Sequence, residues 1–490
     1  MQVTVTRKDS KFLPDPSRVI ARFLYSNDER SADIIRKVLA MSESEVNTAL
    51  SQVLRGFSIR HRNISKIFEM HYNKLNNLFK EMDINQENLD LSRKALIGSY
   101  FTMEYSIESA AFFNPSIVED PDQSELMPDE KRVIFSFRAT GEGHISSIVF
   151  RSAIIDKNNN LIIEPVGKML AEAEIIKRYI YYKKSFIKKL DEMRGFDNEI
   201  SPDFVLEKLA DNFTYGELKR LIEEIRKTHQ LSTIEELIIN RMMWLAKSHY
   251  ELEFSLDSAI SERVIFPTSE TERNGIEDAR FVKFTDDNGE VTYYATYTAY
   301  DGITILPKLL ETKNFYHFKV LPINGEIARN KGMALFPRKF NGKYAMLCRP
   351  DGVNNYIAYS DNINIWREAK LIQKPKYPWE LIQVGNCGSP VETEEGWLVI
   401  THGVGPMREY VLGASLYELD NPEKEIGRLK TPLLAPNDEE REGYVPNVVY
   451  SCGSIVHNGN LIIPYAKSDF SSTYACINLR ELLDELKNSR

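Results

Sequence analysis

Apolar positions near the start of the chain recur at the three- and four-residue spacing of amphipathic helices. Three groups show this spacing: Val19, Ile20, Phe23 and Leu24; Ile34, Ile35, Val38 and Leu39; and Leu50, Val53 and Leu54. Ser42 and Glu45 have the spacing of a capping box, which satisfies backbone N–H groups at a helix N-terminus. The pattern predicts an N-terminal helical region over residues 1–95, ending after the polar stretch 85–90.

The pattern changes to strands from about Leu96. Residues 132–141 and 145–155 are rich in β-branched and aromatic residues, and the polar stretch 156–160 follows them as a turn. A first strand unit is therefore predicted over 96–162. The helical period then returns in 169–190, 204–213, 217–227 and 234–247, which predicts a helical insertion over 163–249 with a solvated surface of mixed charge.

Strand patterning dominates after Tyr250, in four segments that share one layout. Each has a strand, a tight polar turn and an aromatic-rich strand, and the segments begin at Asp278, Met333, Gly388 and Gly453. The turns DNGE, NGKY, EEGW and HNGN supply the Gly and Asn that hairpins need at positive φ. With the first unit, these repeats predict a mainly β chain, a five-bladed β-propeller whose remaining blades span 250–478, followed by a C-terminal helix over 479–490. A β-sandwich is the alternative.

Composition narrows the function classes. The 490 residues include 62 Lys and Arg against 71 Asp and Glu, a net charge of −9, which argues against nucleic-acid and membrane partners. The start of the chain lacks the apolar stretch of a secretory signal, and no segment approaches the roughly 18 apolar residues of a membrane span. Four separated cysteines without CxxC spacing predict neither a metal site nor a disulfide framework. We expect a cytoplasmic protein.

Polar residues stand at matching places in successive units. A propeller gathers such side chains around its central channel, so we expect them to converge on one pocket. Any one of these polar residues, taken alone, is also typical of a turn or of the protein surface. The candidates are Asn114, Ser116, Arg138, Asp278, Arg280, Lys331, Arg349, Gln383, His402, Tyr410 and Asp469.

The motifs that carry these residues resemble a known family. GIEDARFVKF, ALFPRKFNGKYAMLCRP, EEGWLVITHGVG and GYVPNVVYSCGSIVHNGNLIIPYAKSD, in this order, are similar to glycoside hydrolase family 130. That family comprises β-mannoside phosphorylases and some β-mannosidases on a five-bladed β-propeller. The resemblance covers nearly all of 250–475 and the segment near 100–155. The helical additions make the chain similar to the longer members, which include 1,2-β-oligomannan phosphorylases.

The resemblance implies inverting cleavage with inorganic phosphate as the nucleophile, so that no second catalytic carboxylate and no cofactor is needed. Asp278 would be the proton donor, acting through a hydroxyl of the bound mannose. The sugar-binding residues would be Asn114, Ser116, Arg138, Arg280 and Asp469, with the first two near the phosphate as well. The phosphate-binding residues would be Lys331, Arg349, Gln383, His402 and Tyr410.

Two positions depart from the family pattern. Gln383 stands where phosphorylases usually carry Lys, and Lys331 stands where they usually carry Arg, although Arg329 is nearby. One lost charge weakens a phosphate site by about 1.5–3 kcal/mol. The resemblance therefore leaves open a β-mannosidase, in which a carboxylate activates water; the candidate bases are Asp351, Glu392, Glu394 and Glu442. A sugar-binding propeller without catalysis is a third hypothesis.

The expected partners are a small carbohydrate and phosphate. The helical additions have no motif of their own. We interpret them as contacts of a homo-oligomer or as walls around the substrate.

Overall fold

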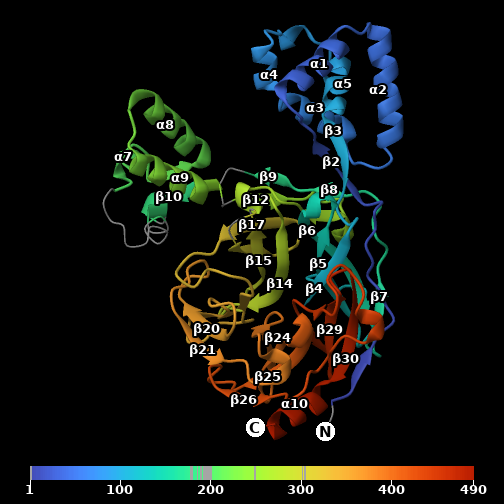
Figure 1. Cartoon of the computed structure of the whole chain (residues 1–490), viewed down its shortest axis with the longest axis vertical. Helices are drawn as coiled ribbons and strands as arrows, with labels where there is room; N and C mark the ends of the chain where they lie inside the picture. Colours follow the sequence, from blue (N-terminus) through green and yellow to red (C-terminus); the bar gives the residue numbers. More distant parts are fainter. Residues whose placement is uncertain are drawn as a thin grey trace.

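The structure of the chain is a computed structural model that describes residues 3–176, 180–184, 186–187, 190, 201–247, 250–300, 302 and 305–489. Within these ranges the chain is mainly β, as predicted, with nine α-helices (Figure 1). None of the described helices is both long enough and apolar enough to cross a membrane.

Five sheets of four to six strands make up most of the fold. The first contains β4 (Ala111–Glu119), β5 (Lys131–Thr140), β6 (Ser146–Ile155), β7 (Leu161–Ile163), β8 (Ala171–Glu172) and β13 (Arg263–Ile265). The second contains β14 (Ile276–Thr285), β15 (Val291–Tyr300), β16 (Ile305–Thr312), β17 (His317–Pro322), β12 (Tyr250–Glu253) and β9 (Glu174–Ile176). The third contains β18 (Ala334–Leu335), β19 (Tyr344–Cys348), β20 (Asn355–Ser360) and β21 (Ala369–Gln373).

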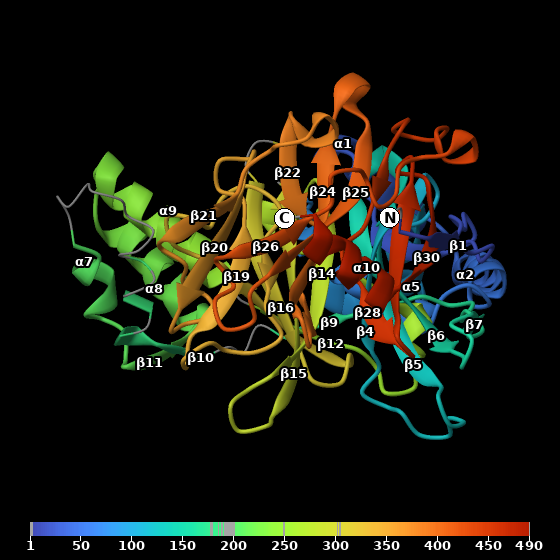
Figure 2. The ribbon, with the colours of Figure 1, turned by 90° about the horizontal axis from the view of Figure 1, so that it is seen from below.

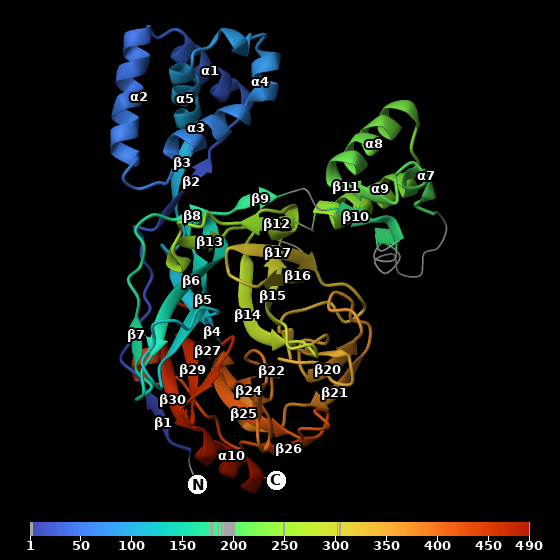
Figure 3. The ribbon, with the colours of Figure 1, turned by 180° about the vertical axis from the view of Figure 1, so that it is seen from behind.

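The last two sheets have the same antiparallel layout. The fourth contains β22 (Gln383–Asn386), β23 (Val391–Thr393), β24 (Gly396–Val404), β25 (Tyr410–Tyr417) and β26 (Glu425–Arg428). The fifth contains β27 (Val449–Tyr450), β28 (Ile455–His457), β29 (Asn460–Lys467), β30 (Ser471–Asn478) and the N-terminal strand β1 (Val5–Arg7). Because β1 pairs with β30, the two ends of the chain lie close together (Figures 1 and 3).

Each sheet contacts the next one along the chain, and the last contacts the first. β14 packs against β4, β15 against β18, β22 against β19 and β20, β25 against β27, and β29 and β30 against β4. Apolar side chains fill these junctions; Phe112 and Ile462, for example, share one buried cluster between the first and fifth sheets. The C-terminal helix α10 (Leu479–Asn488) packs against β26 (Figure 2).

The four predicted hairpin turns are confirmed. Gly289, Asn341, Gly396 and Asn458 each have positive φ at the turns between β14 and β15, β18 and β19, β23 and β24, and β28 and β29. The predicted strands at 132–141 and 145–155 correspond to β5 and β6. Local turn chemistry and strand propensity therefore predicted these elements correctly.

The N-terminal helices form a bundle that stands apart from the sheets (Figure 1). They are α1 (Asp28–Leu39), α2 (Glu43–Phe57), α3 (Ile64–Asn73), α4 (Asn76–Glu81) and α5 (Leu91–Tyr100). The predicted capping box of Ser42 and Glu45 is present at the start of α2. The helical region extends to Tyr100, beyond the expected change to strands at Leu96.

The first apolar group does not form a helix, which corrects the sequence-based prediction. Residues 19–23 form β2 (Val19–Phe23), which pairs with β3 (Thr102–Ser106). An apolar group over a few residues fits a helix and a strand equally well, and here the distant partner strand decides.

The described part of the insertion contains both short strands and helices. α7 (Asp203–Leu206), α8 (Tyr215–Thr228) and α9 (Thr233–Lys247) surround an apolar cluster of their own. The helix predicted over 169–190 is wrong at 171–176 and 180–182, which contain β8, β9 and β10 (Ile180–Tyr182), the last paired with β11 (Asn212–Thr214). The described residues 183–184, 186–187 and 190 are helical, as predicted. Residues 177–179, 185, 188–189, 191–200 and 248–249 of the predicted insertion lie outside the described residues.

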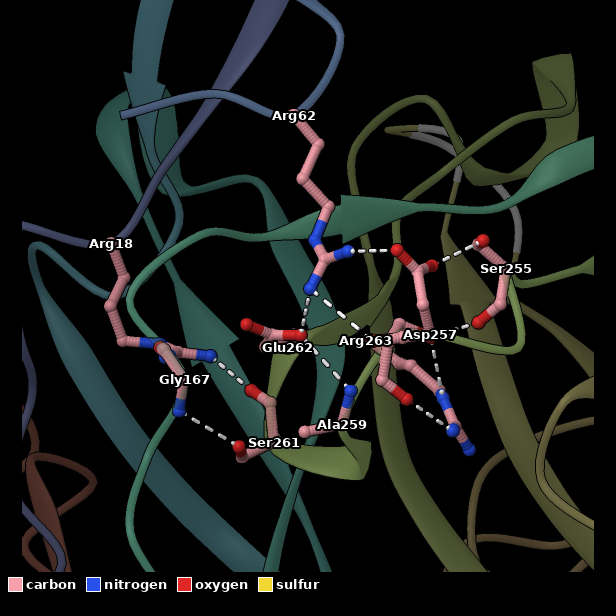
Figure 4. Close-up of polar contacts among 10 residues, drawn as sticks. Arg18, Arg62, Gly167, Ser255, Asp257, Ala259, Ser261, Glu262 and Arg263 are labelled. Carbon is pink, nitrogen blue, oxygen red and sulfur yellow. Dashed lines mark hydrogen bonds and ion pairs between the residues drawn. The ribbon is translucent and has the colours of Figure 1, made fainter. Parts of the chain in front are cut away.

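Polar contacts join the N-terminal region to the sheets (Figure 4). Arg62 donates to Asp257 at 2.9 Å and to Glu262 at 2.6 Å. Arg18 donates to the carbonyl of Gly167 at 2.9 Å. A Cβ at Gly167 would lie 2.2 Å from the Glu262 side chain, so a larger residue here would displace Glu262 from its present position.

Candidate active site

Two irregular strand positions bring Asn114 and Asp278 together. β4 and β14 are the first strands of neighbouring sheets, and each shifts register at this point. Asn114 and Asp278 both have left-handed backbones, with φ of 49° and 56°. A bulge of this kind changes the direction in which a side chain points. The left-handed backbone conformation costs about 1–3 kcal/mol for a residue other than glycine. As a result, Asn114 Nδ2 donates to Asp278 Oδ1 at 2.7 Å.

Cations surround the buried carboxyl of Asp278. Arg138 Nη1 lies 3.8 Å from Asp278 Oδ1, and Arg280 Nη1 donates to the Asp278 carbonyl at 3.0 Å. Burial raises the pKa of Asp278, but the charges of Arg138, Arg280 and Lys331 outweigh burial and lower this pKa below its ordinary value. The carboxyl is therefore ionised at neutral pH as long as no further anion binds beside these cations.

Glu277 is a site residue that the sequence reasoning missed. Its carboxylate pairs with Arg138 at 2.7 Å and with Lys331 at 2.5 Å. Neighbouring residues of a regular strand face opposite sides of the sheet, so Glu277 and Asp278 were not expected in one pocket. The bulge in β14 turns both carboxylates toward Arg138. Its place beside Asp278 in the GIEDAR motif was the only available signal.

A second group lies at the ends of the third, fourth and fifth sheets. Arg349 Nη1 is 3.1 Å from His402 Nε2, and the His402 ring stacks on Tyr410 at 6.1 Å between centroids. Tyr450, also missed from the sequence, lies 5.0 Å from the His402 ring and accepts a hydrogen bond from Arg280 Nη2 at 2.7 Å. Tyr450 therefore connects this group to the residues around Asp278.

Arg280 and Arg349 are buried cations with neutral hydrogen-bond partners. They are 2% and 9% exposed. Their Nη groups donate to the Tyr450 hydroxyl, the Asp278 carbonyl and His402, and the Nε of each has no partner among the described residues. In that part of the chain neither guanidinium lies within 4.0 Å of a carboxylate oxygen. Burying a charge without an opposite charge is unfavourable, so this arrangement favours an anion.

Asp469 lies beside this network, in the tight turn between β29 and β30. Its backbone is left-handed, with φ of 50°. Burial raises the pKa of Asp469 to about 6, with Asp278 adding to this effect and Arg138 opposing it. Asp469 therefore changes charge close to neutral pH.

Replacing Asp469 by Asn is expected to raise thermal stability at pH 8, by on the order of 2 °C. The folded-state pKa of about 6 lies above the ordinary value of 3.8, so the folded protein disfavours the carboxylate and loses stability as pH rises through this window. Asn does not titrate. The Tm difference between the two proteins should therefore grow from about pH 4 to pH 7; parallel Tm curves would contradict the raised pKa.

Three predicted site residues, Ser116, Lys331 and Gln383, have different surroundings from the others. Ser116 is fully buried, and its Oγ accepts from the Phe281 backbone at 3.1 Å, between the first two sheets. Lys331 pairs with Glu277 on the acidic side of the site. Gln383 begins β22, two residues before Gly385 and on the same strand face. The remaining predicted residues belong to the connected network or lie beside it: Asn114, Arg138, Asp278, Arg280, Arg349, His402 and Tyr410 are connected, and Asp469 lies beside them.

The candidate bases for a hydrolase lie outside this network. Glu392 pairs with the half-exposed Arg338 at 2.8 Å. Burial raises the pKa of Asp351, but hydrogen bonds from its own loop outweigh burial and lower this pKa to about 2. Glu394 and Glu442 are exposed, and so is Arg329. Over the described ranges, no three His, Cys, Asp or Glu residues are grouped in a way that could hold a metal ion.

Comparison with known proteins gives a consistent result. The model of the glycoside hydrolase 130 family, described as beta-1,4-mannooligosaccharide phosphorylase, matches residues 225–488. A 1,2-beta-oligomannan phosphorylase from Thermoanaerobacter sp. (strain X514) is 35% identical over 46% of this chain and 75% of that protein. A beta-1,2-mannobiose phosphorylase from Listeria innocua is 30% identical over 55% of this chain and 74% of its own.

A solved structure of the Listeria innocua enzyme with beta-1,2-mannobiose also matches. It has a TM-score of 0.47 and 23% identity over 77% of this chain and 92% of that chain.

Proposed function

The chain belongs to glycoside hydrolase family 130, and on that premise we propose that it is an inverting β-mannoside phosphorylase. It cleaves β-1,2-linked mannobiose or short oligomannans with inorganic phosphate and releases α-mannose 1-phosphate. The linkage is taken from the relatives named as phosphorylases of 1,2-beta-oligomannan and beta-1,2-mannobiose.

One observation supports phosphate, and not water, as the nucleophile. Arg280 and Arg349 are buried, and their guanidinium groups hydrogen-bond to neutral partners. A water nucleophile would leave Arg349 without an opposite charge and Arg280 with only the more distant charge of Asp278. A phosphate dianion offsets both guanidinium charges and accepts hydrogen bonds from their remaining N–H groups. The retained pair therefore supports phosphorolysis even though Gln383 replaces a basic residue of the family pattern.

The reaction needs one protein acid. A phosphate oxygen attacks C1 of the mannose unit as the bond from C1 to the glycosidic oxygen breaks, on the opposite face. A mannose hydroxyl gives its proton to the leaving oxygen, and Asp278 restores that proton. Asn114, Arg138 and Asp469 hold the sugar. Neither a metal ion nor an organic cofactor is required by this scheme.

Phosphate binding also prepares the acid. The low pKa of Asp278 depends on the charges of Arg138, Arg280 and Lys331, which outweigh burial. A dianion beside Arg280 offsets part of that charge and raises the pKa of Asp278 toward the protonated form that an acid needs. Phosphate and the catalytic proton therefore bind cooperatively.

The fold provides this convergence if the five sheets are the blades of one β-propeller. The cycle of contacts from the first sheet to the fifth and back to the first supports that arrangement. The blades are then 96–162 and 250–478, with residues 1–95, 163–249 and 479–490 as helical additions that serve as homo-oligomer contacts or substrate walls. A cytoplasmic location is part of the same proposal.

Incubation with β-1,2-mannobiose, with and without phosphate and in the presence of a chelator, tests the function. We expect α-mannose 1-phosphate only when phosphate is present. Free mannose formed at the same rate without phosphate would instead identify a β-mannosidase. No turnover on a panel of β-mannosides would refute both activities and favour a sugar-binding protein.

A further inference from the structure

His402 is one of the most deeply buried polar side chains of the site. It is 1% exposed and lies on β24, opposite Gly385 of β22. Its Nδ1 is 3.2 Å from the backbone carbonyl of Asn386, and its Nε2 is 3.1 Å from Nη1 of Arg349. Both ring nitrogens therefore have a protein partner.

Cys387 Sγ also lies 3.8 Å from Nδ1, but a thiol can donate or accept, so the Asn386 carbonyl and the Arg349 guanidinium determine where the imidazole proton lies. A carbonyl oxygen can only accept a hydrogen bond, so Nδ1 carries the proton and donates to Asn386. A guanidinium can only donate, so Nε2 is unprotonated and accepts from Arg349. A second proton on His402 would place two N–H donors and two positive charges 3.1 Å apart. The geometry thus requires a neutral ring with its proton on Nδ1.

Neighbouring groups hold the ring in this state. A Cβ at Gly385 would lie 2.3 Å from His402 Cε1 and 2.9 Å from Arg349 Nη1, so glycine leaves the space that the pair occupies. Burial lowers the pKa of His402 well below its ordinary range, and Arg349 and Arg280 lower it further. The charged and titratable groups that face the ring are Arg349, Arg280, Cys387, Tyr410 and Tyr450.

We propose that His402 is a positioning residue, a neutral hydrogen-bond acceptor that orients Arg349 toward the anion. His402 then contributes no positive charge to phosphate binding, in contrast to the direct ligand role that the sequence suggested. The cations of this half of the site are Arg280 and Arg349. The inference rests on the proposed function only in naming phosphate as the anion.

Two substitutions of His402 distinguish a role as hydrogen-bond acceptor for Arg349 from a role as a cation that binds phosphate. In His402→Gln the amide oxygen reaches the place of Nε2 and accepts from Arg349, so the KM for phosphate should stay within about threefold of the wild type. In His402→Leu no acceptor remains, and the KM for phosphate should rise about tenfold, with the KM for the mannoside little changed. Equal losses in both variants would overturn the proposal.

Gly385→Ala provides an independent variant, because it alters no hydrogen-bonding group. Its methyl group displaces the His402–Arg349 pair, so it should raise the KM for phosphate as His402→Leu does. A phosphate KM equal to that of the wild type would contradict the positioning role.

Nuclear magnetic resonance determines the tautomer of His402 without any enzymatic turnover. In protein labelled with ¹⁵N-histidine, the signals absent from His402→Gln belong to His402. They should show a neutral ring protonated at Nδ1 from about pH 5.5 to pH 8, with and without phosphate. An imidazolium in this range would overturn the inference. If the tautomer is as expected and no phosphorolysis is found, only the proposed function fails.

Discussion

Replacing Asp278 by Asn is expected to lower kcat for phosphorolysis at least about 100-fold. The amide cannot supply a proton, whereas its oxygen can still accept the hydrogen bond from Asn114 that holds the carboxylate. The fold should therefore remain, and the variant should still bind mannobiose by calorimetry. Initial rates of mannose 1-phosphate formation measure the effect.

A matched control variant distinguishes the loss of the catalytic acid from the loss of a negative charge in the site. Glu277→Gln removes the neighbouring carboxylate, which pairs with Arg138 and Lys331, and should cost less than Asp278→Asn. A 4-nitrophenyl β-mannoside has a leaving group that needs no proton, so it should recover most of the rate of Asp278→Asn. Equal losses in the two variants, or no recovery with this substrate, would refute the role of Asp278 as the acid.

Replacing Arg349 by Met is expected to raise the KM for phosphate about 100-fold, with a much smaller effect on mannoside binding. Met keeps the length of the side chain but removes the charge and the forked donors that match a phosphate. One or two charged hydrogen bonds account for an effect of this size. Initial rates over a phosphate series provide the measurement.

The same variant tests whether the buried charge is functional. Because Arg349 is a buried cation with neutral partners, Arg349→Met should not lower the Tm. Arg338→Met removes an arginine that pairs with Glu392 outside the site and should leave the KM for phosphate unchanged. A large Tm loss in Arg349→Met without a change in the KM for phosphate would show that Arg349 serves the fold and not the anion.

The sequence by itself determined the mainly β character and the family, and it predicted most residues of the candidate site. Turns at Gly289, Asn341 and Asn458 depend on local backbone preferences, which sequence reveals directly. The motif residues were also accessible, since their order along the chain is the family pattern. The eight predicted residues in or beside the connected network come from all five sheets. Seven lie on the first, second, fourth and fifth sheets or in the turns at their ends, and Arg349 directly follows β19 of the third.

The tertiary structure alone decided which residues meet and in what state. Residues 19–23, 171–172, 174–176 and 180–182 became strands because distant partners pair with them, and no local pattern encodes a partner. Glu277 joined Asp278 because a bulge cancels the alternation that a strand pattern assumes. Lys331 pairs with Glu277, and His402 is neutral beside Arg349, because charge and tautomer depend on neighbours brought together by folding.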